Sequence, residues 1–530
     1  RPAAGPGSDR ETERQLAGIL RGLSPELVGI SSDRMDRVVE LGQWAGEALS
    51  KGDAATVTID ESGNAKWFSG DALNRVNSPT FSLRDGHHLT LASLAGDIAT
   101  RVSQNATEPL KQIDELFRFV ITETMLVPDA HDQQLPGTPL ESLLLGRSTA
   151  SGRAWAVGVL LRQLQFDAVI LEPKSKPEAW LIGVITPAGD VLLYDPRLGT
   201  CIPSEPGAAG FEKPATVEQV KQNPALLREL DVEDAPYALG KDDLASFNVR
   251  LITDSSAASQ RMAKLQTMIT GTLMEVFDGV VKSPLREKGL ADRVIAAGAK
   301  GGWSAGDVSV WSYPEQQADA FISSGAEQSK AWKPIADVFA GPVILTQVRK
   351  QTKNENEAMS EADVRRAEEP LRHVRVIHLQ GDYAEALRKY GPIRLSAQRL
   401  SMMTRNPELL DELAKALPLN SKAADFAGFW IASCQTRVNP KIAPDTLSWY
   451  TREYPQGEMI AAVPELLATA YVNAGKAKEA VAFFESGRKN LSPRQKLLLK
   501  IWESSVAKPP AESKTPEKPA EPATASPPST

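Results

Sequence analysis

The chain has 530 residues, of which 42% are hydrophobic and 24% charged, and this composition is typical of a globular protein with about three or four domains. A net charge of −7 excludes the basic surface of a nucleic-acid binder, and no run of apolar residues is long enough to predict a transmembrane helix. Two cysteines exclude both a disulfide framework and a cysteine-rich zinc site.

Residues 1–10 carry Pro, Gly and Ala with little apolar content, so we expect them to be disordered. Residues 11–88 form an N-terminal helical and hairpin region, with helical spacing over 11–50 and strand-like alternation over 55–68. The chain begins with Arg rather than Met, which would fit removal of a signal peptide, so we expect an exported protein, periplasmic or secreted.

Residues 89–253 are expected to form the next domain, which opens with helical spacing from Leu89 to Met125. The segment 146–203 then predicts a helix that ends near Arg162, a strand over Ala168–Leu171, and further strands that lead into Trp180 and Asp195. A short apolar run at 249–252 is a candidate edge strand.

The segment 146–203 resembles the core of transglutaminase-like (papain-like) domains. The resemblance rests on Leu160-Leu161-Arg162 at the helix end, with Gln165 where the family usually has glycine, on Glu178-Ala179-Trp180 at the place of His-Ala-Trp, and on Tyr194-Asp195-Pro196. It implies an α+β fold with one helix packed on an antiparallel sheet. It also places Ala150 at the position of the nucleophilic cysteine and Glu178 at that of the histidine, so only Asp195 of the three catalytic residues remains.

An alanine cannot ionise, so the chemistry of the family is lost at this position. Ser148, Thr149 and Ser151 stand beside Ala150, either as caps of the helix N-terminus or as replacement nucleophiles with Glu178 as the base. A second hypothesis pairs Glu178 with Arg153 across the vacant cleft, next to Trp180; the alternative is that both charged side chains point to solvent.

The remaining reactive side chains do not suggest a second site. Cys201 lies in a turn rich in Pro and Gly and is interpreted as a structural free thiol. His131 lies between Asp129 and Asp132, a weak pattern for a metal that fits a solvated loop better. We therefore expect no metal and no cofactor.

Residues 254–365 predict a helix-rich middle region, with an amphipathic helix over 262–281, and suggest no function. Residues 366–506 resemble a short tetratricopeptide-like array, because Gly381 and Gly475 each lie in a turn followed by Ala-rich helical spacing. An ordinary helical bundle is the alternative. The tail 507–530, rich in Pro, is expected to be disordered.

Together these features predict an α+β transglutaminase-like core followed by a C-terminal α-helical repeat-like domain. The predicted function is non-catalytic binding of a protein or peptide partner through the degenerate cleft and the helical region. The alternative is an active acyl transferase or hydrolase that uses a serine of the same cleft as its nucleophile.

Overall fold

The computed structural model describes residues 6–27, 33–50, 65–129, 137–269, 274–279, 288–322, 326–349, 360–366, 369–402 and 410–507. The fold is a mixture of helices and sheet, as expected. The predicted hairpin over 55–68, the His131 loop and the tail from residue 508 lie mostly or wholly outside these ranges.

Two antiparallel helices form the N-terminal region, α1 (Pro6–Gly22) and α2 (Arg34–Ser50), and they pack through Leu16 and Leu41 on the next long helix, α4 (Leu83–Ser103). Helix α1 begins at Pro6, so the expected disorder over 1–10 is wrong from that residue on, because proline is well suited to the first turn of a helix. A short helix, α3 (Gly70–Asn77), precedes α4.

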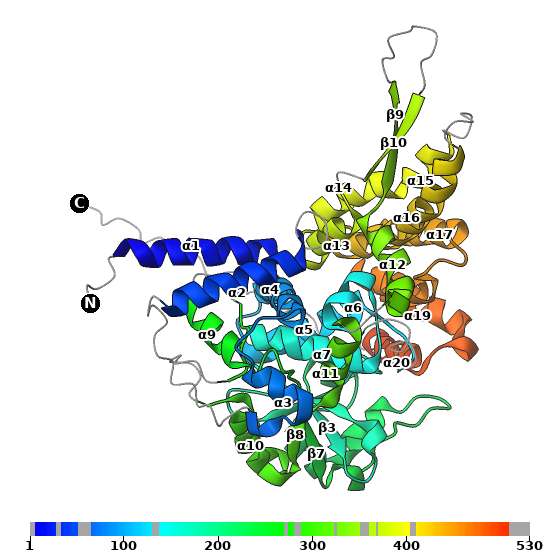
Figure 1. The fold of residues 1–530 in the computed structure, drawn as a ribbon. Helices are drawn as coiled ribbons and strands as arrows, with labels where there is room; N and C mark the ends of the chain where they lie inside the picture. Colours follow the sequence, from blue (N-terminus) through cyan, green and yellow to red (C-terminus); the bar gives the residue numbers. More distant parts are fainter. Residues whose placement is uncertain are drawn as a thin grey trace, which may run out of the picture.

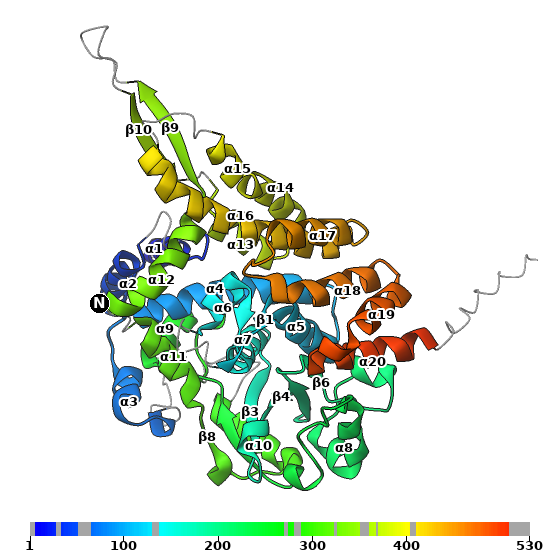
Figure 2. The same ribbon diagram turned by 90° about the vertical axis from the view of Figure 1, so that its right-hand side faces the viewer.

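Within the described residues the central sheet has six strands in the order β6-β5-β4-β3-β7-β8 (Figure 2). Their bounds are β3 Asp167–Pro173, β4 Leu181–Ile185, β5 Val191–Asp195, β6 Thr200–Cys201, β7 Phe247–Leu251 and β8 Val308–Val310. All neighbours pair antiparallel except β7 and β8, which are parallel. The sheet is therefore mixed rather than antiparallel, and β7 is an inner strand rather than the expected edge strand.

Helices cover both faces of this sheet. Ile170 and Tyr194 face the layer made by α4, α5 (Pro109–Glu123) and α7 (Ala150–Gln163). Val169 and Leu193 face the opposite layer, which contains α8 (Val217–Gln222) and α10 (Leu290–Gly301). Because successive strand residues point to opposite faces, burial on both sides makes these strands apolar throughout.

The C-terminal region consists of helices that pack on one another in succession (Figure 2). Their bounds are α13 Leu371–Leu379, α14 Tyr383–Arg394, α15 Ser396–Ser401, α16 Leu410–Val438, α17 Ala443–Glu453, α18 Val463–Asn473, α19 Ala477–Ser486 and α20 Pro493–Ala507. Helix α15 continues the direction of α14. Gly381 and Gly475 join the pairs α13/α14 and α18/α19 with positive φ angles of 82° and 75°. The turns predicted from sequence are thus helix-pair turns, while the tetratricopeptide identity stays a prediction.

The helical region and the α+β region share one hydrophobic core. Phe117 of α5 and Leu161 of α7 belong to the same buried cluster as Val374 of α13 and Trp430 of α16. Likewise β8, which lies in the predicted middle region, completes the sheet. The expected boundaries at residues 253 and 366 therefore do not separate independent cores.

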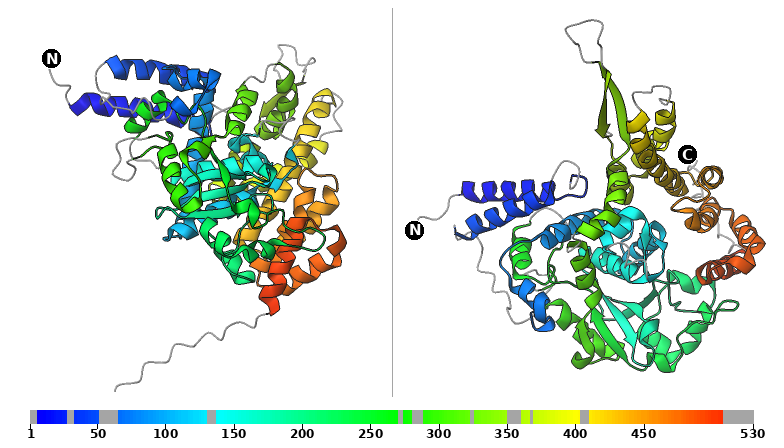
Figure 3. Two further views of the ribbon diagram at one scale, coloured as in Figure 1. Left: turned by 90° about the horizontal axis from the view of Figure 1, so that it is seen from below. Right: turned by 45° about the vertical axis from the view of Figure 1, so that its right-hand side comes forward.

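Residues 254–365 contain more than helices. Helix α9 (Gln260–Met268) ends well before the predicted residue 281, and α11 (Ser312–Ile322) and α12 (Ala326–Ala340) follow. A two-stranded hairpin of β9 (Val343–Arg349) and β10 (Ser360–Arg366) then projects from the body of the molecule (Figures 1 and 3). Strands of seven residues such as these are hard to separate from helical spacing in the sequence.

Candidate functional site

The N-terminus of α7 lies at the place that the sequence assigns to the lost nucleophile. Ala150 is the first residue of the helix, and Thr149 caps it by accepting a hydrogen bond from the Gly152 amide at 3.1 Å. The predicted capping role is confirmed for Thr149. Ser148 lies in the short strand β2 (Arg147–Ser148), which pairs with β1 (Met125–Leu126), and its buried hydroxyl has no hydrogen-bond partner among the described residues. Ser151 is half-buried.

Arg153 fixes the first turn of α7 to its neighbours through neutral acceptors. Its Nη1 donates to the Pro196 carbonyl at 3.0 Å, its Nε donates to Thr124 Oγ1 at 3.2 Å, and its Nη2 donates to the Thr124 carbonyl. Burial, with the nearby Arg494, lowers the pKa of Arg153 to about 9. The hypothesis of an ion pair between Arg153 and Glu178 is therefore wrong, since Arg153 is buried against carbonyls while Glu178 is exposed.

Asp195 ends β5 and stabilises the turn that follows it. Its Oδ1 accepts hydrogen bonds from the amides of Arg197 at 2.7 Å and Leu198 at 3.1 Å, and its Oδ2 accepts from the Tyr237 hydroxyl at 2.9 Å. Burial, and then the Asp195 carboxylate, raises the pKa of Tyr237 well above its ordinary value. With both oxygens engaged in this way, Asp195 has a structural role in the turn.

Arg197 connects this turn to residues 178–180, the segment that stands where the resembled family has His-Ala-Trp. Its guanidinium donates to the carbonyl of Trp180 at 2.9 Å and to that of Glu178 at 3.0 Å, and it lies 4.2 Å from the centre of the Trp180 ring. Glu178 itself lies in a single 3₁₀ turn, Pro177–Ala179, with its side chain in solvent. The structure thus brings the three predicted segments together through Arg153 and Arg197, whereas the side chain of Glu178 has no part in that contact.

Aromatic side chains are the main feature of this site. We name Trp180, Trp311 and Tyr313 the aromatic row: the ring centres of Trp180 and Trp311 are 6.2 Å apart, and Trp311 stacks on Tyr313 at 4.9 Å. The Tyr313 hydroxyl lies 3.3 Å from Thr149 Oγ1, which places the end of the row at the start of α7. All three rings are half-buried. The sequence shows Trp311 and Tyr313 close together, but nothing in it indicates that they meet Trp180.

Neither thiol can replace the missing nucleophile. Cys201 and Cys434 are both buried, and burial raises the pKa of Cys201 to about 12 and that of Cys434 well above its ordinary value. The interpretation of Cys201 as a structural free thiol agrees with this environment. Among the side chains that the structure describes, no three His, Cys, Asp or Glu residues gather as metal ligands would.

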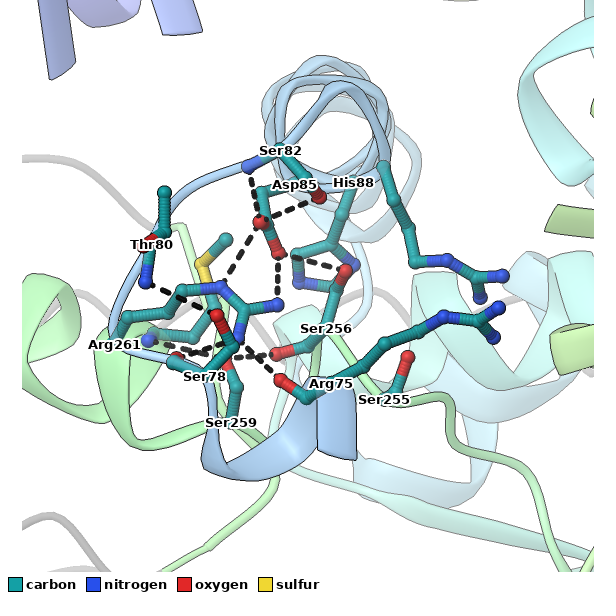
Figure 4. Close-up of polar contacts among 12 residues, drawn as sticks. Arg75, Ser78, Thr80, Ser82, Asp85, His88, Ser255, Ser256, Ser259 and Arg261 are labelled. Carbon is teal, nitrogen blue, oxygen red and sulfur yellow. Dashed lines mark hydrogen bonds and ion pairs between the residues drawn. The ribbon is translucent and has the colours of Figure 1, made fainter. Parts of the chain in front are cut away.

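A second polar cluster, absent from the sequence prediction, surrounds Asp85 at the start of α4 (Figure 4). The Asp85 carboxylate accepts hydrogen bonds from Arg261 at 2.7 and 2.9 Å, from the Ser256 hydroxyl at 2.8 Å and from the Ser82 amide at 2.7 Å. His88 points instead to the Val276 carbonyl, 2.9 Å away. Since Asp85 and Ser256 are fully buried, this cluster joins α3, α4 and α9 and does not form an accessible triad.

In comparisons with known proteins, no family model, no curated protein and no solved structure matches the chain. In the described part of the chain, no helix is both long and apolar enough to cross a membrane.

Proposed function

We propose that this protein is a non-catalytic, transglutaminase-like binding protein that holds an extended peptide segment of a partner at the aromatic row. The observation that carries the proposal is the presence of three half-buried aromatic rings at the N-terminus of α7, where catalysis would need a nucleophile and a base.

The family resemblance is supported by the backbone next to α7. Gln165, at the position where the family usually has glycine, adopts a φ of 63°. A left-handed conformation is the physical reason for a glycine at such a place. The helix that begins at Ala150 and the strand that ends at Asp195 also have the order and the contact that the resemblance implies.

The chemistry of the row favours a segment rich in proline. Flat aromatic faces bind the rings of a polyproline II helix, which loses little conformational entropy on binding. Arg197, stacked on Trp180, adds a cation at one end of the row, so an acidic residue near the prolines is favoured as well. We do not assign peptide binding to the helical region, because part of its surface already packs against the α+β region in a shared core.

Tryptophan fluorescence tests the proposal on the whole chain. A proline-rich peptide with one flanking glutamate should change the emission in a saturable way, whereas a peptide with alanine at each proline should not. Trp311→Leu should weaken binding at least about fivefold, as removal of a central aromatic contact does. Trp449→Leu is the matched control, because Trp449 is also half-buried but packs on Tyr454 in the helical region.

Equal binding by wild type and Trp311→Leu, or no binding of either peptide, would contradict a role for the row. The alternative function is tested with a fluorophosphonate probe: labelling that is lost in Ser148→Ala or Ser151→Ala would support an active serine hydrolase or acyl transferase. We expect no labelling, since no described histidine or carboxylate is hydrogen-bonded to Ser148.

A further inference from the structure

A separate group of charged side chains lies where α2, α4, α13 and the short helix α6 (Pro139–Leu145) meet. We name Arg34, His87, Glu141 and Arg372 the arginine cluster. His87 Nε2 lies 3.1 Å from Thr138 Oγ1 and 3.5 Å from Glu141 Oε2. One ring, that of Phe321, lies 4.4 Å from the His87 ring and 5.6 Å from the Arg34 guanidinium, so it holds these two side chains together.

Backbone packing fixes the position of Arg34. Its side-chain carbons cross α4 at Gly86, where a Cβ atom would lie 3.0 Å from Arg34 Cγ. Arg372 stands in the first turn of α13, the helix that packs on α6, and it affects the pKa of both Glu141 and His87. Arg34, near the N-terminus, and Arg372, in the C-terminal helical region, therefore both act on one buried carboxylate, that of Glu141.

The two arginines have donors without acceptors. Nε of Arg34 and both Nε and Nη2 of Arg372 are shielded from solvent and have no hydrogen-bond partner in the described part of the chain. Neither arginine forms an ion pair there within direct contact distance, whereas nearby Arg84 is paired with Glu315 at 3.1 Å. Both side chains are half-buried, and the shielded donors that lack acceptors are costly, because these N–H groups have given up water without a replacement.

The local field also favours a negative ligand. Arg34 is the first residue of α2 and Arg372 is in the first turn of α13, and helix N-termini carry partial positive charge that repels cations and attracts anions. Glu141 compensates only in part, because burial raises its pKa to about 7 against the lowering effect of Arg34 and Arg372. Burial, followed by Arg34, lowers the pKa of His87 well below its ordinary value, so the imidazole is neutral.

We propose that Arg34 and Arg372 bind an oxyanion, a phosphate or carboxylate group of a ligand, at the junction of α2 and α13. Guanidinium forks match such groups in geometry as well as charge. The site is independent of the aromatic row and would join the N-terminal helices to the C-terminal helical region.

Sulfate is the probe of choice, because its charge does not change near neutral pH. In titrations of the full chain at constant ionic strength, sulfate should raise the melting temperature where chloride does not. Arg34→Gln and Arg372→Gln should each weaken sulfate binding about tenfold, as expected for loss of charge-assisted hydrogen bonds. Arg399→Gln, a change at an exposed arginine of α15, should leave it unchanged.

Glu141→Gln is a second and opposite test, which does not depend on the folding of the arginine variants. Removing the competing carboxylate should tighten sulfate binding above about pH 7 and should make sulfate binding less dependent on pH. The other ionisable groups that act on the cluster are His87, His88, Arg84, Asp33 and Glu26. Parallel titrations with inorganic phosphate and acetate distinguish the two ligand groups. An equal response in wild type, Arg372→Gln and Arg399→Gln, or no response to any of the anions, would overturn the proposal.

Discussion

Gln165 is a single residue in a costly backbone conformation. It follows the end of α7 with a φ of 63°, and its side chain gains only a 3.3 Å hydrogen bond to Glu275. Glycine reaches this region without the steric penalty of a side chain, which is about 1–2 kcal/mol per residue.

We predict that Gln165→Gly raises the free energy of unfolding by about 0.5–1 kcal/mol, because relief of the strain outweighs the added chain entropy and the lost hydrogen bond. Urea unfolding followed by circular dichroism measures this. Gln165→Ala is the control, since alanine keeps the steric penalty. A stabilisation of the same size in both variants would show that the backbone is not the cause.

The ion pair of Arg375 with Glu123 joins two elements, α13 and α5. Both side chains are fully buried, with Nη1 of Arg375 at 3.0 Å from Glu123 Oε2, and Arg375 also donates to the Leu143 carbonyl at 2.9 and 3.1 Å. The guanidinium lies 4.7 Å from the centre of the Trp430 ring. One arginine of the helical region therefore satisfies acceptors on both α5 and α6.

Arg375→Met should lower the free energy of unfolding by about 3–5 kcal/mol, because it leaves a buried carboxylate without its partner. Arg388→Met removes an exposed arginine that pairs with Glu385 in the same helical region and should cost far less, because solvent screens an exposed ion pair. Chemical denaturation of both variants gives the comparison. Similar losses in the two would mean that burial does not strengthen the Glu123 pair.

The ion pair of Arg375 with Glu123 also predicts how the stability of the fold depends on pH in the acid range. Burial by itself would raise the pKa of Glu123, but His378 and Arg375 together hold it well below its usual range. Since burial lowers the pKa of His378, Arg375 supplies the charge at neutral pH. A depressed carboxyl pKa stabilises the fold above the pKa of the unfolded chain, about 4.3, and this stabilisation is lost as the pH falls through lower values.

The stability difference between wild type and Glu123→Gln should therefore shrink as the pH is lowered from about 6 to about 3. Denaturation at several pH values measures it. The control is Thr122→Val, a neutral change beside Glu123, whose effect should not depend on pH. A difference for Glu123→Gln that stays constant across the range would contradict the assignment.

At the scale of the whole molecule, the shared core couples the α+β and helical regions. Arg147 of β2 pairs with Glu458, between α17 and α18, at 2.8 Å. Arg494 of α20 donates to the carbonyl of Gly199, just before the edge strand β6, at 2.9 Å. We predict that both regions unfold in one calorimetric transition. Arg375→Met should shift that transition as a unit, and two separated transitions in either protein would contradict the coupling.

Local patterns predicted the long elements well, because helical spacing around Leu116 or Leu161 depends only on neighbouring residues. They could not predict that β8 pairs with β7, since three residues carry little signal and the pairing spans a long connection. At the site, the family resemblance implied that the segments of Ala150 and Asp195 meet, but it did not predict the direction of their side chains. The sequence therefore did not predict that Arg153 donates to carbonyl groups instead of pairing with Glu178. It also did not predict that the rings of the aromatic row meet.

The shared core also has a consequence for biosynthesis. Phe117 and Leu161 leave the ribosome long before Val374 and Trp430, the residues that help to cover them. At about 5–20 residues per second, the nascent chain would expose this apolar surface for tens of seconds. We expect folding to finish only after the last helices have been translated, and a chaperone to occupy the uncovered surface until then.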